Sequence, residues 1–322
     1  MGARADRALT HVNAEADNLK HHGIINPAAI YAAGFMSSDR RAPMEIKNIL
    51  LHLDHSKGCQ NRLATALGMA KKHDALITGL FVVPDYVVPS YVEAQISVDL
   101  ITDVTEKALH RARETLVGYQ QLVDEAEVTM DAHVVEGQVI PILREHSKYS
   151  DLLILGQDDP EDPDNASYGL ADALLFEGAC ACLVVPHSGK LAQPGERVLL
   201  TWNASRESAR ALREAMPLLQ SATTVVVLSS EPDDSDTSIA RSHPHADELA
   251  RFLESHGIES ISSGISDMDI GPSDAILGQA AEMNADLIVM GAYGHARLRE
   301  IILGGVTRDL LKLSPVPIFM AH

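Results

Sequence analysis

The sequence predicts an α/β fold in which two parallel sheets follow one another along the chain. Short apolar segments alternate with segments of helical periodicity, a pattern typical of βαβ units. The same order of elements then repeats at an offset of about 135 residues, far longer than the period of a solenoid repeat. With 322 residues the chain is long enough for two domains of ordinary size.

The first copy begins near Met44. In it, Leu63, Leu67 and Ala70 recur at helical spacing, and a short apolar run ends at Gly156. The predicted strands are residues 46–53, 75–83, 128–135, 151–155 and 182–185. The predicted helices are residues 61–72, 98–123, 138–148 and 170–176.

The second copy follows a polar segment that contains Gly and Pro. Ala209, Leu212 and Met216 share a helix face, and Pro217 is expected to end that helix. The predicted strands are residues 197–202, 223–228, 260–265, 287–290 and 316–320. The predicted helices are residues 207–216, 246–256, 273–283 and 307–313.

Matching landmarks identify the two copies as a duplication. The segment 151–156 (DLLILG) matches the segment 286–291 (DLIVMG), and Asp54 and Asn203 each end the first strand of a copy. We therefore expect a first domain at residues 44–188, a linker at 189–196 and a second domain at 197–322. Residues 1–43 lack a sustained pattern, and we interpret them as a disordered N-terminal extension or as sequence translated from an early start codon.

Composition excludes several classes of protein. A net charge of −19 disfavours a broad basic face for nucleic acid. No apolar run approaches the roughly 20 residues that span a bilayer. Three cysteines are too few for a secreted disulfide framework, which favours a cytoplasmic location. Cys180 and Cys182 share one strand face, and we expect both to be buried and reduced.

The segment 286–307 (DLIVMGAYGHARLREIILGGVT) carries the main functional signal. Gly291, Gly294, Gly304 and Gly305 lie between a predicted strand and a predicted helix. Glycines let a backbone approach phosphate closely, and the first helical N–H groups are unpaired donors. The same glycines can also serve only to make tight turns, so the local pattern leaves both interpretations open.

This glycine spacing resembles the nucleotide-binding signature of the universal stress protein family, and the duplicated pattern resembles the tandem members of that family. The resemblance covers about residues 44–322. It implies two tandem open parallel five-stranded sheets in the order 3-2-1-4-5, flanked by helices and related to adenine-nucleotide α-hydrolase-like folds. It also implies that the two domains pack as a pseudo-dimer.

In that family ATP lies at the carboxyl ends of the strands, with its phosphates on the glycine loop. The matching residues here are Thr201, Trp202, Asn203, Ser230, Met290, Gly291, Gly294, Gly304, Gly305, Val306, Thr307 and Arg308. Two positions depart from the family pattern: Gly305 replaces the usual Ser or Thr, and Asn203 replaces an acidic residue. The resemblance implies a stress-response regulator that binds ATP, with or without Mg²⁺, in its second domain and acts as a ligand-dependent switch.

The first copy is degenerate at the same place. Asp159 stands where Gly294 does, and Leu170 where Gly305 does. Carboxylates crowd this segment without a Lys or Arg: Asp158, Asp159, Glu161, Asp162, Asp164, Asp172 and Glu177. Like charges would oppose a triphosphate, so we expect a solvated acidic loop and no nucleotide in this half.

Other chemistry has little support in the sequence. His52, Asp54 and His55 lack a further ligand for a metal site, and no nucleophile elbow or P-loop motif occurs. We therefore expect at most weak ATPase activity. Two alternatives remain open: a nucleotide-free scaffold for dimerisation or for a protein partner, and a slow nucleotide hydrolase. A homodimer is also open.

Overall fold

The computed structural model describes residues 45–85, 98–165, 169–189, 193–229, 244–264, 271–293 and 305–322. The predicted N-terminal extension, residues 1–43, lies outside the described residues. The boundaries expected for the two domains and the linker stay predictions.

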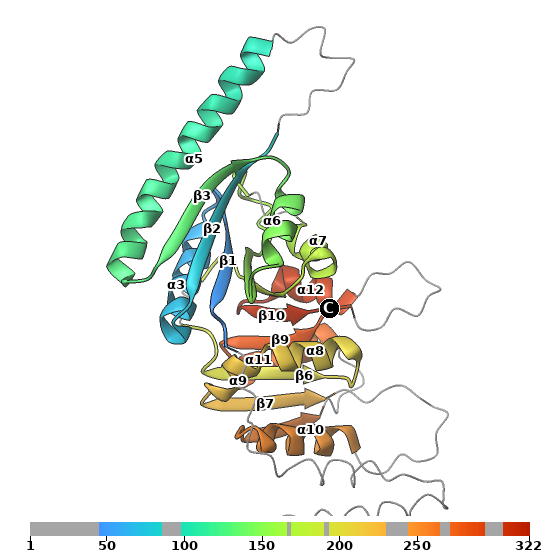
Figure 1. Cartoon of the computed structure of the whole chain (residues 1–322). Coiled ribbons are helices and arrows are strands. Elements are labelled where there is room, and N and C mark those ends of the chain that lie inside the picture. The colour runs from blue at the N-terminus through green and yellow to red at the C-terminus, as the bar shows by residue number, and fades with distance from the viewer. Residues whose placement is uncertain are drawn as a thin grey trace, which may run out of the picture. The chain divides into compact units, whose positions relative to one another are not determined.

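The first half follows the predicted alternation of strands and helices (Figure 1). Its strands are β1 (Asn48–Leu53), β2 (Leu76–Val83), β3 (Met130–Glu136), β4 (Leu152–Gly156) and β5 (Ala181–Val185). Its helices are α3 (Cys59–His73), α5 (Val98–Ala126), α6 (Val139–Ser147) and α7 (Leu170–Glu177). The predicted bounds agree with these to within a few residues.

The second half repeats this order. Its strands are β6 (Arg197–Trp202), β7 (Thr224–Ser229), β8 (Ser260–Gly264), β9 (Leu287–Gly291) and β10 (Ile318–Ala321). Its helices are α8 (Arg206–Glu214), α9 (Met216–Gln220), α10 (Pro244–Ser255), α11 (Pro272–Glu282) and α12 (Gly305–Leu313).

One predicted helix end is wrong. Pro217 was expected to end a helix that included Met216, yet α8 already ends at Glu214 and Pro217 lies in the first turn of α9. Proline fits there because a first-turn residue needs no N–H partner inside the helix. The proline therefore begins a new short helix instead of only stopping one.

Among the described residues, ten strands form one sheet in the order β3-β2-β1-β4-β5-β10-β9-β6-β7-β8. Each half thus has the order 3-2-1-4-5 that the family resemblance implies. Within each half the strand pairs are parallel. The halves join through β5 and β10, which pair antiparallel with Phe319 opposite Leu183. The two tandem sheets are consequently continuous.

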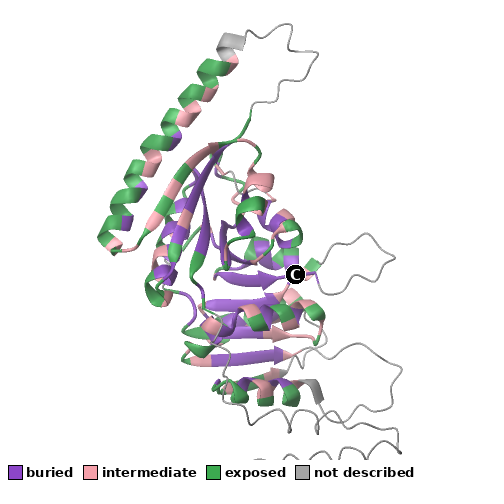
Figure 2. Ribbon diagram, in the orientation of Figure 1, coloured by how far each residue is buried: buried purple, intermediate pink, exposed green. Residues whose placement is uncertain are grey.

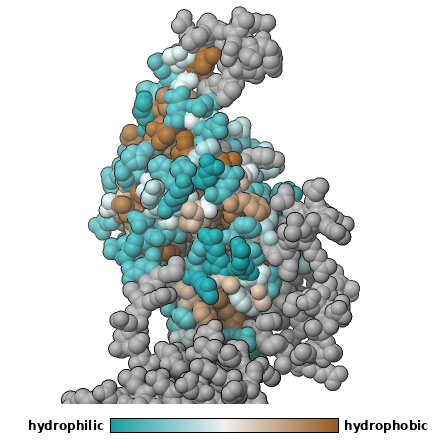
Figure 3. All heavy atoms as spheres, turned by 45° about the vertical axis from the view of Figure 1, so that its right-hand side comes forward, coloured by the Kyte–Doolittle hydropathy of each residue, from teal (hydrophilic) through white to brown (hydrophobic). Residues whose placement is uncertain are grey.

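Helices cover both faces of this sheet. One apolar cluster includes residues of α3, α5, α8, α9 and α10, and the other includes residues of α6, α7, α11 and α12. Central strands are buried along their length, as the purple arrows of Figure 2 show. The face seen in Figure 3 is mainly hydrophilic with smaller apolar patches. No helix in the described part of the chain is long and apolar enough to cross a membrane.

Candidate functional site

The carboxyl ends of β6 and β9 meet at the point where the strand order of the second half reverses. β6 pairs with β7 on one side and with β9 on the other. Open α/β sheets bind ligands at such switch points. Thr201 and Trp202 end β6 here, and the Thr201 hydroxyl donates to the Val289 carbonyl at 3.5 Å. The predicted adenosine end therefore lies at the edge where this fold class binds ligands.

Asn203 shapes the turn that follows β6. Its Oδ1 accepts a hydrogen bond from the Ser205 amide at 3.2 Å, and Ala204 has φ +57°. Ser205 then caps α8, because its hydroxyl accepts from the Ser208 amide at 3.1 Å. One side-chain oxygen of Asn203 is thus used in an Asx turn, which an aspartate at this position could also make.

The side chain of Trp202 has a buried N–H donor that no described residue pairs with. The residue is half-buried and packs against the core on the α8 side of the sheet. Its indole Nε1 is buried and has no hydrogen-bond partner among the described residues. A buried indole N–H normally finds a partner. This atom is therefore a candidate contact for a ligand at the end of β6.

Gly291 is required by packing. A Cβ added at Gly291 would lie 2.4 Å from the Ser208 amide nitrogen and 2.5 Å from the Glu207 carbonyl carbon. Both belong to the backbone at the start of α8, which cannot move without disturbing the cap. Close packing of α8 against the end of β9 therefore accounts for Gly291, and this glycine gives no separate sign of phosphate binding. Met290, the preceding site candidate, is buried in the core.

The start of α12 is more open. Gly305 is exposed, and an added Cβ would meet no atom of the described residues within 4 Å. Val306 is half-buried, whereas Thr307 is 3% exposed. The Thr307 hydroxyl accepts a hydrogen bond from the Tyr293 amide at 3.3 Å. Thr307, predicted as a phosphate ligand, therefore ties the start of α12 to the residue after Ala292.

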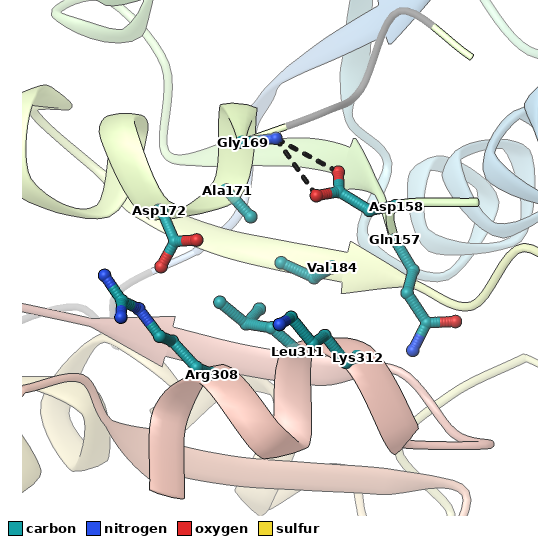
Figure 4. Close-up of a pocket in the computed structure, with 9 residues that line it drawn as sticks. All are labelled: Gln157, Asp158, Gly169, Ala171, Asp172, Val184, Arg308, Leu311 and Lys312. Atoms are coloured by element: carbon teal, nitrogen blue, oxygen red, sulfur yellow. Dashed lines mark hydrogen bonds between the residues drawn. The ribbon is translucent and has the colours of Figure 1, made fainter. Parts of the chain in front are cut away.

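Arg308 lies at the junction of the two halves. It lines a small pocket with Lys312 of α12 and with Asp158 and Asp172 of the first half. Figure 4 shows the Arg308 side chain extending toward Asp172. Three other predicted site residues, namely Ser230, Gly294 and Gly304, lie outside the described residues.

Comparison with known proteins agrees with this geometry. The model of the universal stress protein family matches residues 195–322, which contain every predicted site residue. The second half of the chain is therefore similar to the universal stress protein family. A universal stress protein of Methanocaldococcus jannaschii is 37% identical over 49 residues, which are 15% of this chain and 30% of that protein. The chain thus spans under a third of that curated relative.

Solved structures extend the fold match over both halves. A universal stress protein from Archaeoglobus fulgidus is 19% identical with a TM-score of 0.66, over 86% of this chain and 96% of that chain. A protein of unknown function from Pseudomonas aeruginosa is 16% identical with a TM-score of 0.55, over 86% of this chain and 92% of that chain. These likenesses establish the tandem universal stress fold.

In the first half, side chains of the protein itself pair with the acidic residue that follows β1. Asp54, which ends β1, is 3% exposed and lies 2.5 Å from the Arg62 guanidinium of α3. The Ser56 hydroxyl also donates to Asp54 Oδ1, at 2.5 Å. Burial opposes ionisation, yet Arg62 and Ser56 together hold the pKa of Asp54 below its usual range. The carboxylate that matches Asn203 is therefore already paired.

The helix N-terminus of the first half holds a carboxylate of its own. Asp158 accepts hydrogen bonds from the Gly169 amide at 3.0 and 3.2 Å, drawn as dashed lines in Figure 4. Burial raises the pKa of Asp158. Gly169 corresponds to Gly304 of the second half, so Asp158 lies where the second half would present amides to a phosphate.

The expectation of a solvated acidic loop is wrong for part of this segment. Asp162 is 7% exposed and accepts from the Lys57 amide at 2.7 Å, which lowers the pKa of Asp162. Asp164 pairs with both terminal nitrogens of Arg111 at 3.1 and 3.2 Å. The acidic residues thus hold the loop against the segment after β1 and the middle of α5, which the run of like charges did not reveal.

The described residues contain no group of three or more His, Cys, Asp or Glu side chains that could hold a metal ion. His52 is fully buried in the core beside Asp54 and Arg62. Cys182 is buried and Cys180 is half-buried, and burial raises the pKa of both thiols. Neither thiol has the electropositive, exposed setting of a reactive cysteine.

Proposed function

We propose that the second half binds one adenine nucleotide, ATP with or without Mg²⁺, and that the protein acts as a ligand-dependent switch in a stress response. The asymmetry between the halves carries this proposal. In the first half, Asp158 accepts a hydrogen bond from the Gly169 amide, and Arg62 forms an ion pair with Asp54. In the second half, no atom of the described residues lies within 4 Å of a Cβ added at Gly305, where α12 starts.

Two features of the second half suit an adenine nucleotide. The unpartnered Trp202 Nε1 lies at the end of β6, where the family resemblance puts the adenosine. Arg308 and Lys312 supply positive charge on α12, next to the predicted phosphate loop. A bound Mg²⁺ would supply further neutralisation of phosphate charge. Nucleotide would then shift the population of two conformations in proportion to its differential affinity for them.

The second candidate function is a nucleotide-free interaction scaffold. The observation that favours it is the continuous sheet, since β5 and β10 join the halves without any ligand. A scaffold would not need glycine at position 294, so any residue there that allows folding would preserve its function. No catalytic residue for hydrolysis is identified among the described residues of either half. Any ATP turnover would therefore be slow and incidental.

Replacing Gly294 distinguishes these two functions. A bulky side chain, as in Gly294→Leu, would hold phosphates away from the loop backbone. We expect ATP affinity to fall about a hundredfold, because charge-assisted hydrogen bonds contribute about 1.5–3 kcal/mol each. Titration of the purified variant with ATP checks this.

Gly278→Leu on α11 is the matched control, since Gly278 is exposed and has open space around an added Cβ. It should bind ATP like the wild type. The nucleotide proposal fails if Gly294→Leu, folded as judged by its thermal transition, binds ATP as well as the control does.

A further inference from the structure

Tyr293 connects the predicted nucleotide loop to the other half of the protein. It follows β9 by two residues, and residue 294 is the first of the loop. Its hydroxyl donates a hydrogen bond to Asp172 Oδ1 on α7. Its ring stacks on Phe176, also on α7, with ring centroids 4.3 Å apart and an interplanar angle of 26°. The chain after β9 is therefore held against a helix of the first half at Tyr293.

The backbone around Tyr293 is held as firmly as the side chain. The Tyr293 amide donates to the Thr307 hydroxyl, and the Ala292 amide donates to the Ala321 carbonyl at 2.9 Å. His322 Nδ1 lies 3.0 Å from the Ala292 carbonyl oxygen, and its ring packs edge-on against Phe176 at 4.7 Å. Contacts from α7, α12 and the end of β10 thus converge on two consecutive residues.

The conformation of Tyr293 needs such support. Its φ of +59° is a left-handed value that bulky residues rarely adopt and that costs on the order of 1 kcal/mol or more. The side chain is nevertheless 9% exposed, so it is packed instead of projecting into solvent. The contacts with α7 therefore select the direction in which the chain leaves β9 and enters the loop.

The negative charge of Asp172 is unfavourable for an anion site at the start of α12. Its carboxylate faces Arg308, a predicted phosphate contact, and lies in the same pocket as Asp158 and Lys312. A negative charge at this point opposes an anion bound at the start of α12. Its role as hydrogen-bond acceptor for Tyr293 supplies a reason for its presence.

We propose that Asp172 and Phe176 of the first half are positioning residues for the proposed nucleotide site at the start of α12, acting through Tyr293 and its contact with Thr307. Binding affinity in the second half then depends on the docking of α7. Linkage makes the effect reciprocal, so bound nucleotide stabilises the contact between the halves. This inference rests on the proposed function.

A double-mutant cycle on ATP affinity tests it. The full chain is prepared as wild type, Tyr293→Phe, Asp172→Ala and the double variant, and each is titrated with ATP. Tyr293→Phe removes only the hydroxyl, and we expect about tenfold weaker binding. Removing the Asp172 charge changes the field equally in both backgrounds, so the cycle cancels that effect. We expect a coupling factor of about tenfold between the two positions.

Glu177→Gln is the matched control. Glu177 is a carboxylate on the same helix, and it pairs with Arg144 at 2.9 Å within the first half. Its removal should leave ATP affinity within twofold of wild type. Thermal unfolding of every variant identifies general loss of folding.

The outcomes separate the two proposals. Additive effects of Tyr293→Phe and Asp172→Ala, or affinity unchanged in both, would overturn the positioning role while leaving nucleotide binding intact. A wild-type protein that is folded and binds no ATP would overturn the proposed function and this inference with it.

Discussion

At the scale of single residues, the buried polar cluster under the end of β1 would oppose a ligand in the first half. Arg62 is 1% exposed and Asp54 is 3% exposed, so both charges are taken out of water. Breaking such a pair leaves an uncompensated buried charge. The pair is therefore a fixed part of the first half, and a nucleotide could approach Asp54 only by displacing it.

Sequence could indicate Asp54 but not its partner. A strand-ending acid is visible as a landmark, whereas Arg62 lies on a helix where a charged residue is expected at the surface. Only the packing of α3 against β1 brings the two together. Asp158 and Tyr293 were missed for the same reason, because their partners lie on other elements and no spacing links them.

His52 gives this cluster a testable pH dependence. It is fully buried, and its ring nitrogens have no hydrogen-bond partner among the described residues. Burial, aided by the nearby Arg62, lowers the pKa of His52 from 6.5 to about 4. The unfolded chain therefore binds the extra proton first as pH falls, and stability present above about pH 6.5 is lost between pH 6.5 and 4.

The expected loss from His52 over that window is about 3 kcal/mol. Denaturant unfolding of wild type and His52→Leu at several pH values measures it. The wild type should lose more stability than the variant as pH falls. Equal pH dependence in the two proteins would show that His52 does not titrate differently on folding.

At the scale of elements, the alternation of strands and helices was predictable and the helix N-termini were not. Period-two and period-3.6 patterns located the strands and helices to within a few residues, apart from the short helix α9, which contains Pro217. The N-termini of α7 and α12 look alike in sequence, each following a glycine. At α7, Asp158 folds back onto the Gly169 amide, a contact across eleven residues that the sequence does not indicate.

Gly305 at the start of α12 offers a gain-of-function test. The family usually has a hydroxyl residue here, and the structure has open space for a side chain. We expect Gly305→Ser to bind ATP about tenfold more tightly, because its hydroxyl adds one hydrogen bond to a charged phosphate. Gly305→Ala adds the Cβ alone and should match wild type. Titration with ATP compares the three proteins, and equal affinities would place the phosphates away from position 305.

At the scale of the whole molecule, two copies of one fold have taken different roles within a continuous sheet. The family resemblance correctly implied the strand order of each half, whereas the antiparallel pairing of β5 with β10 was not predicted. The asymmetry of the sites was visible only in part, as Asp159 in place of a glycine. The structure adds why the first half needs no ligand, since its own carboxylates occupy the corresponding donors.

Stoichiometry tests the central claim most directly. Isothermal titration of the folded full chain with ATP should give one binding site per chain, because Asp158 covers the N-terminus of α7 and no carboxylate of the described residues accepts from the first amides of α12. Two sites per chain would mean that Asp158 and Arg62 do not close the first half. No binding by a protein with an intact thermal transition would contradict the assignment of the second half as a nucleotide site.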